Sequence, residues 1–244
     1  KGEDRKEGKK EVTAMLHVKL TRPKREADYR VAEAYKALRT NIQFCGVENK
    51  VIMLTSSTPG EGKTSTSFNL AASLAEIGKK VVLIDADMRK SNLVKRYMVE
   101  VRVKGLSQFL SGQNSIEEVL YETSIPNLHM IFAGAVPPNP AELLNGAVFE
   151  KMVKAMKDAY DYIIIDTPPL GSVTDAAVVS RLCDGVVFVC AAGEVRRKFA
   201  QDIVRQVTAA GSKLLGVVLT KAENGGKGYY NKYYGRYYGK YGNE

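Results

Sequence analysis

A glycine-rich segment, residues 57–64, has the residue types and spacing that bind phosphate. It reads Ser-Thr-Pro-Gly-Glu-Gly-Lys-Thr, with Ser57 where the first glycine of such a loop usually stands. Gly60 and Gly62 let the backbone fold its N–H groups around phosphate oxygens. Lys63 can reach the β- and γ-phosphates of a nucleotide, and the Thr64 hydroxyl can ligate Mg²⁺. We predict that the nucleotide-binding residues are Pro59, Gly60, Glu61, Gly62, Lys63, Thr64 and Ser65.

The alternative is an ordinary glycine-rich turn between a strand and a helix. The phosphate loop is the better interpretation because a predicted strand precedes residues 57–64 and a predicted helix begins at Lys63.

Three aspartates follow apolar strands elsewhere in the chain. Asp85 and Asp87 end the run Val-Leu-Ile-Asp-Ala-Asp, and Asp166 ends Ile-Ile-Ile-Asp. Ligands of an open parallel sheet bind at the carboxyl edge of its strands. A single aspartate there is usually a turn former or a helix cap, but three on two strands beside a phosphate loop predict a cluster for magnesium binding and proton transfer.

Regular elements must hold these side chains in place. Apolar periodicity predicts a helix from Asp28 to Phe44 and another from about Lys63 to Ile77, which Gly78 would end. Asn139-Pro-Ala-Glu142 is typical of a helix start, with Asn139 as the cap and Glu142 completing a capping box. Strands are predicted at Lys50–Ser56, Val81–Asp85, Leu128–Phe132, Tyr162–Asp166, Val186–Cys190 and Leu215–Leu219.

This alternation predicts an α/β protein of the three-layer P-loop type, with a mainly parallel sheet covered by helices on both faces. At 244 residues the chain can form one sizeable core. We predict a basic flexible arm at residues 1–27, a P-loop domain at 28–223 and a disordered tyrosine-rich tail at 224–244.

Composition narrows the class of protein. The net charge is +9, and residues 1–25 hold nine Lys and Arg against four acids, so the arm could approach a membrane surface, a nucleic acid or an acidic partner, or could simply be solvated. No apolar run approaches the ~20 residues that span a bilayer. The three cysteines predict reduced structural thiols, and the two histidines stand too far apart to favour zinc.

Several motifs together resemble those of the bacterial tyrosine kinases of capsular and exopolysaccharide assembly, a branch of the P-loop proteins related to the MinD/ParA ATPases. The resemblance covers roughly residues 28–244. Its parts are Glu33–Gln43, Thr55–Thr64, Asp85–Arg89, Ala133-Gly134, Pro137–Leu144, Asp166–Pro169 and a terminal tyrosine cluster.

The resemblance implies an ATP-dependent protein-tyrosine kinase that uses Mg²⁺. Lys63 and Thr64 would belong to Walker A, Asp85 and Asp87 to the second Walker motif, and Asp166 to Walker B. We expect Asp85 to be the base that accepts the tyrosine proton, with Lys63 and Asp87 also catalytic. The metal ligands would be Thr64, Asp87 and Asp166, directly or through water.

Tyrosines crowd the C-terminal end, where seven of the 13 fall between residues 229 and 241. Glycines at this density argue against a packed helix or strand. One interpretation is an aromatic tail that stacks on nucleic-acid bases. The resemblance instead implies autophosphorylation, with the sites Tyr229, Tyr230, Tyr233, Tyr234, Tyr237, Tyr238 and Tyr241.

Glu33, Lys36 and Arg39 share one face of the first predicted helix. They form either a solvated face with a local ion pair or, as the resemblance implies, a contact in a ring-like homo-oligomer such as an octamer. The family has arginine where Lys36 stands, and lysine lacks its planar fork.

The resemblance also implies partners and a location. The partners would be a transmembrane polysaccharide co-polymerase that acts as an activator, and a protein-tyrosine phosphatase. The location would be the cytoplasmic face of the membrane, reached through that activator or through a transmembrane part outside this sequence. No nucleic-acid partner is expected.

Two rival functions remain. A MinD/ParA-like ATPase would carry an extra lysine at position 58, where this chain has Thr58. A nucleic-acid-binding module would use the basic arm and the aromatic tail, but nothing in the core favours base recognition. The adenine contact is undecided, with Leu219–Glu223 as a weak candidate.

Overall fold

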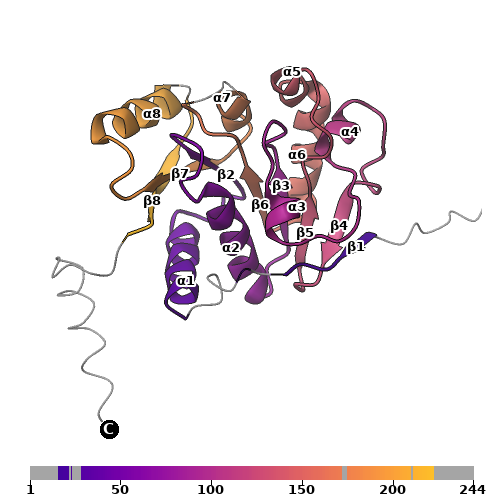
Figure 1. The fold of residues 1–244 in the computed structure, drawn as a ribbon, viewed down its shortest axis with the longest axis horizontal. Coiled ribbons are helices and arrows are strands. Elements are labelled where there is room, and N and C mark those ends of the chain that lie inside the picture. The colour runs from indigo at the N-terminus through magenta and orange to yellow at the C-terminus, as the bar shows by residue number, and fades with distance from the viewer. Residues whose placement is uncertain (1–15, 22, 24–28, 172–174, 210, 223–244) are drawn as a thin grey trace, which may run out of the picture.

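The computed structural model describes residues 16–21, 23, 29–171, 175–209 and 211–222. Within them one eight-stranded sheet runs through the molecule in the order β1-β4-β5-β3-β6-β2-β7-β8 (Figure 1). Every neighbouring pair is parallel except β4 and β5, which are antiparallel. The strands are β1 Leu16–Val18, β2 Val51–Ser56, β3 Val81–Asp85, β4 Leu120–Thr123, β5 Leu128–Ile131, β6 Tyr162–Asp166, β7 Gly185–Ala191 and β8 Leu214–Thr220.

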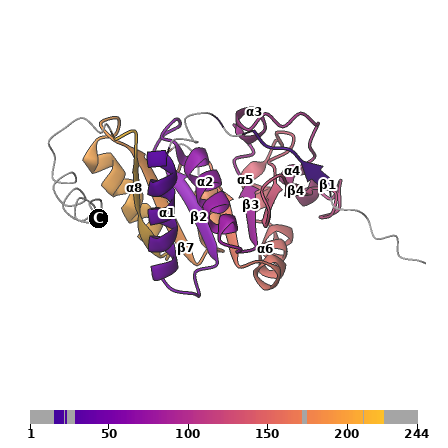
Figure 2. The ribbon, with the colours of Figure 1, turned by 90° about the horizontal axis from the view of Figure 1, so that it is seen from below.

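Helices cover both faces of the sheet, and α2 and α6 lie on opposite sides of it (Figure 2). The helices are α1 Tyr29–Phe44, α2 Lys63–Glu76, α3 Leu93–Arg96, α4 Leu106–Leu110, α5 Pro140–Leu144, α6 Ala147–Ala159, α7 Asp175–Ser180 and α8 Arg197–Ala209. The architecture is the predicted three-layer α/β fold.

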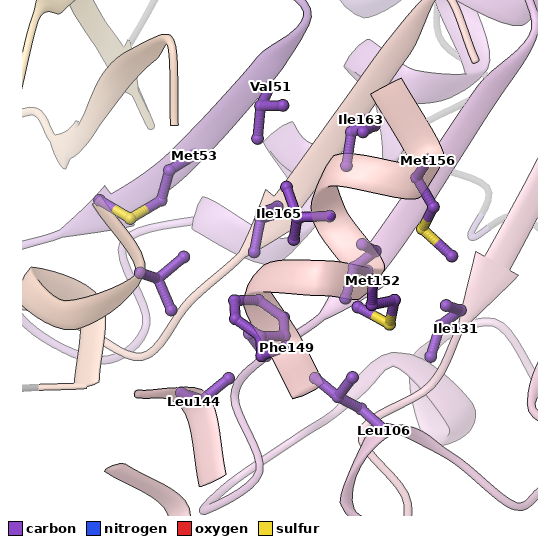
Figure 3. Close-up of a cluster of buried hydrophobic side chains, with 14 of the residues drawn as sticks. Val51, Met53, Leu106, Ile131, Leu144, Phe149, Met152, Met156, Ile163 and Ile165 are labelled. Carbon is purple, nitrogen blue, oxygen red and sulfur yellow. The ribbon is translucent and has the colours of Figure 1, made fainter. Parts of the chain in front are cut away.

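Two buried apolar clusters hold the layers together, one on each face. On one face, Phe149 and Met152 of α6 pack toward Ile163 and Ile165 of β6 (Figure 3). On the other face, Phe68 of α2 belongs to a cluster that includes Ile164 of the same strand, β6. Because the central strands are buried on both faces, they are apolar without the alternation typical of a half-exposed strand.

The predicted elements are confirmed, with ends that differ by one or two residues. The predicted arm is partly wrong, because Leu16–Val18 forms strand β1 beside β4 and Val18 is buried. Three residues are too short to give a periodic signal, and the strand is stabilised by pairing with a segment about a hundred positions away. The rest of the domain boundaries stay a prediction, and the tail lies outside the described residues.

The predicted capping box at α5 is also wrong in detail. Asn139 does stand at the N-cap and Pro140 does begin the helix, but the Asn139 side chain makes no cap hydrogen bond. Its amide instead donates to Glu142 Oε2 at 2.7 Å. The two side chains thus bond to each other and not to the backbone N–H groups of the first turn.

Candidate active site

Three neighbouring strands bring the predicted site together. β3, β6 and β2 lie side by side, and Asp85 of β3 is in register with Asp166 of β6. The glycine-rich loop leaves β2 at Ser56 and enters α2 at Lys63. All of these positions lie at the carboxyl edge of the sheet, where the strand order and parallel direction predict a ligand site.

Asp166 is the centre of the polar network. Its Oδ1 atom accepts hydrogen bonds from Lys63 Nζ at 2.7 Å and Ser67 Oγ at 2.8 Å, and its Oδ2 atom accepts one from Thr64 Oγ1 at 2.7 Å. The side chain of Asp166 is only 1% exposed and that of Lys63 is 6% exposed. A buried carboxylate needs this many partners, because an unpaired charge in the interior is costly.

Asp85 is the second buried carboxylate of the site. It accepts hydrogen bonds from the Asp87 backbone N–H at 3.1 Å and from the Ser91 hydroxyl. Burial, and next the negative charge of Asp166, raise the pKa of Asp85 to about 8, while the Ser91 hydrogen bond and the Lys63 charge act in the opposite direction. A carboxyl with a pKa near neutrality suits proton transfer.

The phosphate loop has the backbone that its glycines allow. Gly60 and Gly62 both have φ of 87°, a region that residues with a side chain rarely adopt. The Glu61 carboxylate points inward, where it accepts hydrogen bonds from Ser57 Oγ at 3.0 Å and from the Thr58 backbone N–H at 2.6 Å. The Glu61 side chain therefore shapes the loop, and any contact of this residue with phosphate falls to its backbone N–H.

The loop after β3 is held at several points. Lys90 donates its backbone N–H to Asp87 Oδ1 at 3.1 Å. The Arg89 guanidinium makes two bonds to Asp175, from Nε at 2.8 Å and from Nη2 at 3.1 Å. Asp175 is fully buried at the start of α7, so this bidentate pair ties the Asp85–Asp87 loop to a separate element.

The sequence indicated no role for Ser67, Ser91 or Asp175, and it named Thr220 only within Leu219–Glu223, as a weak candidate for the adenine contact. Ser67 stands four positions after Lys63, so its place on the same helical face was available from the spacing. No local signal marks Ser91 or Asp175. Thr220, at the end of β8, donates its hydroxyl to the Glu61 carbonyl at 2.5 Å, which only the folded sheet reveals.

The predicted oligomer residues lie away from this site, on α1. Lys36 and Glu33 form an exposed ion pair at 2.7 Å, as the solvated-face interpretation predicts. Arg39 donates from Nη1 to the Ser73 carbonyl at 2.8 Å and to the Ser73 hydroxyl at 3.1 Å, which anchors it to α2. Whether this face also contacts another subunit stays a prediction. The predicted phosphorylation sites, residues 229–241, lie outside the described residues.

The chemistry of the donor set fits a magnesium ion held with a nucleotide. Among the described residues no group of three His, Cys, Asp or Glu side chains could hold a metal by itself. One hydroxyl and one or two carboxylates, completed by phosphate oxygens and water, are instead what Mg²⁺ uses in nucleotide sites. Thr64 donates a hydrogen bond to Asp166, and Asp87 stands two residues after Asp85, which is in register with Asp166.

The parallel sheet and the phosphate loop at its carboxyl edge define a P-loop nucleotide-binding protein of the α/β class. Residues 49–209 match the AAA domain family. The solved kinase domain of the Escherichia coli tyrosine kinase ETK is similar, with a TM-score of 0.76 and 33% identity over 86% of each chain. The septum site-determining protein MinD from Pyrococcus horikoshii, solved with Mg-ADP, has a TM-score of 0.61 at 26% identity over 71% of this chain and 72% of that one.

Sequence comparison is more specific. The tyrosine-protein kinase CpsD of Streptococcus agalactiae is 43% identical over 223 residues, which cover 89% of this chain and 97% of that protein. The tyrosine-protein kinase YwqD of Bacillus subtilis is 38% identical over 77% of this chain and 80% of its own length. The chain therefore belongs to the bacterial tyrosine-protein kinases and is a protein-tyrosine kinase, as the resemblance implied.

In the described part of the chain no helix is both long and apolar enough to cross a membrane.

Proposed function

We propose that the protein transfers the γ-phosphoryl group of Mg-ATP to tyrosines of its own C-terminal cluster and so regulates exopolysaccharide or capsule synthesis and export. The observation that carries the proposal is the convergence of Lys63, Thr64 and Asp166 through hydrogen bonds of 2.7 Å, with Asp85 in register beside them. One site would thus combine a lysine that contacts phosphate, the side chains that bind the metal and the base that accepts the proton.

Lys63 has two successive partners in this proposal. In the structure its ammonium pairs with Asp166 at 2.7 Å. When ATP lies across Gly60–Thr64, the ammonium turns to the β- and γ-phosphate oxygens, where it offsets the charge that develops on the transferring group. That movement removes one of the two donors from Asp166 Oδ1, which keeps the Ser67 hydroxyl, and so makes this oxygen available to a metal ion.

Thr64, Asp166 and Asp87 would hold the magnesium ion, which supplies charge neutralisation at the β- and γ-phosphates. Thr64 and Asp166 are already in hydrogen-bond contact, so both side chains are aimed at the same point. Asp87 is almost buried, and the Lys90 backbone N–H fixes one of its oxygens.

Asp85 is the proposed base. The tyrosine oxygen attacks the γ-phosphorus while its proton passes to an Asp85 carboxylate oxygen, and the bond to the bridging oxygen of ADP breaks. A free phenol has a pKa near 10. A carboxyl whose pKa is raised to about 8 lies closer to it in proton affinity than an ordinary aspartate, and its ionised form accepts the proton.

The tail begins close to this site. β8 ends at Thr220, whose hydroxyl contacts the phosphate loop, and Tyr229 follows nine residues later. Nine residues span at most ~30 Å, so the tail could reach its own site or that of a neighbour. We propose transfer between subunits of a ring-like homo-oligomer, with Glu33, Lys36 and Arg39 at the contact.

Phosphorylation would change the tail strongly. Residues 221–244 hold five Lys and Arg against two acids, and each phosphate adds about −1.5 to −2 charges. Several phosphates would make the tail anionic, and repulsion from the carboxylates of the site would release it, which makes tail phosphorylation an assembly switch.

A membrane activator and a phosphatase complete the proposal. A similar solved structure, with a TM-score of 0.75 and 30% identity over 84% of this chain and 92% of that one, is the chimerical protein CapA2B2, and its being a chimera supports a second protein as partner. The proposed location is the cytoplasmic face of the membrane.

The test is incubation of the purified chain with Mg-ATP, followed by detection of phosphotyrosine. We expect a strong signal that is lost in Asp85→Asn and in a chain that ends at Ala222. Mixing a tail-bearing Asp85→Asn chain with an active chain that ends at Ala222 tests transfer between subunits. Phosphate release without phosphotyrosine would refute the kinase proposal in favour of a MinD-like ATPase. If the active full-length chain becomes labelled but the mixture does not, transfer between subunits is refuted.

A further inference from the structure

The last strand of the sheet has an exposed apolar edge. In the described part of the chain, β8 pairs with β7 and with no strand on its other side. Its sequence, Leu-Leu-Gly-Val-Val-Leu-Thr, contains neither a charge nor a proline. Val217 is 55% exposed and Leu219 is 58% exposed, and their spacing places both on one face of the strand.

Such an edge is unusual for a natural sheet. Unpaired backbone groups along an apolar strand are a template for another strand, and proteins normally protect them with charges, prolines, bulges or a covering segment. β8 is seven residues long, and its only irregularity is a register shift at its beginning, between Val186 and Val187 of β7. The last five residues therefore present a regular, uncharged edge.

We propose that the unphosphorylated tail covers this edge, with Tyr229–Tyr234 adding to β8 as a further strand. The docking itself does not depend on the proposed kinase activity, whereas its release by phosphorylation does. The tail follows β8 directly in the sequence, so its effective concentration at this edge is high compared with that of a partner free in solution.

The connection has the length and residue types of a reversal. The chain leaves the strand conformation at Lys221, which has φ of 53°, and the Lys221 ammonium pairs with Glu194 at 2.8 Å. Residues 221–228 contain three glycines and the pair Asn224-Gly225, a dipeptide that favours the two-residue turns of β-hairpins. Because glycine and asparagine tolerate the positive φ angles of such a turn, the connection can bring the chain back along β8 without steric strain.

The proposed strand matches the edge in chemistry. Tyr229–Tyr234 reads Tyr-Tyr-Asn-Lys-Tyr-Tyr, the first tyrosine block of the tail, and has no glycine inside it. Tyrosine favours strands, and an aromatic side chain opposite a β-branched or aliphatic one stabilises a strand pair. Val217 and Leu219 offer such neighbours.

Phosphate on these tyrosines would oppose the docking. A dianionic group beside Val217 or Leu219 would lose part of its solvation against an apolar surface. A tyrosine held at β8 also cannot occupy an active site, so the tyrosines of Tyr229–Tyr234 are withheld from transfer until this strand detaches.

Hydrogen exchange tests the docking without any catalytic readout. The chain, treated with a phosphatase and kept free of nucleotide, is compared with a chain that ends at Ala222. We expect the amides of residues 216–220 that do not pair with β7 to exchange at least ten-fold more slowly in the full chain. Equal exchange rates in the two chains would overturn the proposal.

Variants of the edge give the second measurement. In the full chain, Val217→Lys with Leu219→Lys should release the tail and speed tryptic cleavage after Lys232 several-fold. Val101→Lys is the matched control, since Val101 is 52% exposed far along the chain from β8, and it should leave the cleavage unchanged. Equal cleavage in both variants would overturn the proposal. Protection of β8 from exchange that disappears on dilution would also overturn it, because the edge would then be covered by a second copy of the chain.

Phosphorylation supplies the third measurement. After incubation with Mg-ATP, the protection of β8 should fall in proportion to the phosphate on residues 229–234. Protection that persists on fully phosphorylated chains would overturn the proposed release. If no phosphotyrosine forms at all, the proposed function fails while the exchange difference between the two unphosphorylated chains still decides the docking.

Discussion

Replacing Lys63 by methionine should destabilise the nucleotide-free protein as well as abolish transfer. The ammonium lies 2.7 Å from Asp166 Oδ1, and the two side chains are 6% and 1% exposed. Methionine has a similar length and fills the same space. The change therefore removes a charge from a buried pair while it leaves the surrounding packing nearly intact.

The size of the effect follows from what stays behind. Removing one partner of a buried ion pair typically costs ~3–5 kcal/mol, because the other charge is left uncompensated. Thr64 and Ser67 still donate hydrogen bonds to Asp166 at 2.7 and 2.8 Å, so the lower end, about 3 kcal/mol, is expected. For a protein of this size, at ~2–4 °C per kcal/mol, the melting temperature should fall by about 6–12 °C.

Thermal unfolding without nucleotide measures this, and two further variants sharpen it. Lys63→Met with Asp166→Asn removes the orphaned charge and should recover much of the lost melting temperature. Lys154→Met is the matched control, because Lys154 also pairs with an acid, Glu150 at 2.6 Å, but on the surface, and it should melt like the parent chain. A Lys63→Met protein as stable as the parent, or a double variant less stable than the single one, would refute the reasoning.

Three further outcomes are expected. Gly62→Ala should weaken nucleotide binding at least about ten-fold, because φ is 87° there and a Cβ atom would lie 3.3 Å from the Thr220 side chain. Calorimetry measures the affinity, and an unchanged value would contradict this expectation. Burial and next the Lys80 charge lower the pKa of His129, so folding stability should fall as the pH drops below 6.5, and His129→Gln should flatten that fall in urea titrations. Burial raises the pKa of the Cys183 thiol, so iodoacetamide at pH 8 should modify Cys183 at least about ten-fold more slowly in the native than in the unfolded protein, and equal rates would contradict this.

Local signals were enough to predict the central elements. β3 and β6 begin and end where their apolar runs do, because each strand is buried on both faces and closed by an aspartate. β1 and β4 escaped prediction because their order depends on pairing with each other and with β5. A three-residue strand such as Leu16–Val18 has no periodicity of its own to detect.

The residues of the site likewise fall into two groups, those that lie in recognisable motifs and those that do not. Lys63, Thr64, Asp85 and Asp166 carry motifs whose spacing follows from phosphate and metal chemistry, and the strand order brings them together. Ser91 and Asp175 act on those groups from outside the motifs, through one hydrogen bond to Asp85 and one ion pair with Arg89. Such supporting contacts depend on where loops pass in space, which no local pattern records.

Contacts from distant parts of the chain also support the phosphate loop. The Glu61 carbonyl accepts the Thr220 hydroxyl at 2.5 Å, and the Glu61 carboxylate accepts the Ala191 backbone N–H at 3.4 Å. The conformation of the loop therefore depends on the ends of β7 and β8, which follow it in sequence by about 130 and 160 residues. Since the tail leaves the same end of β8, a strand docked on that edge and a nucleotide bound by the loop act on one shared element. We therefore expect nucleotide affinity to differ between the full chain and the chain that ends at Ala222, and equal dissociation constants would show that the edge and the loop are independent.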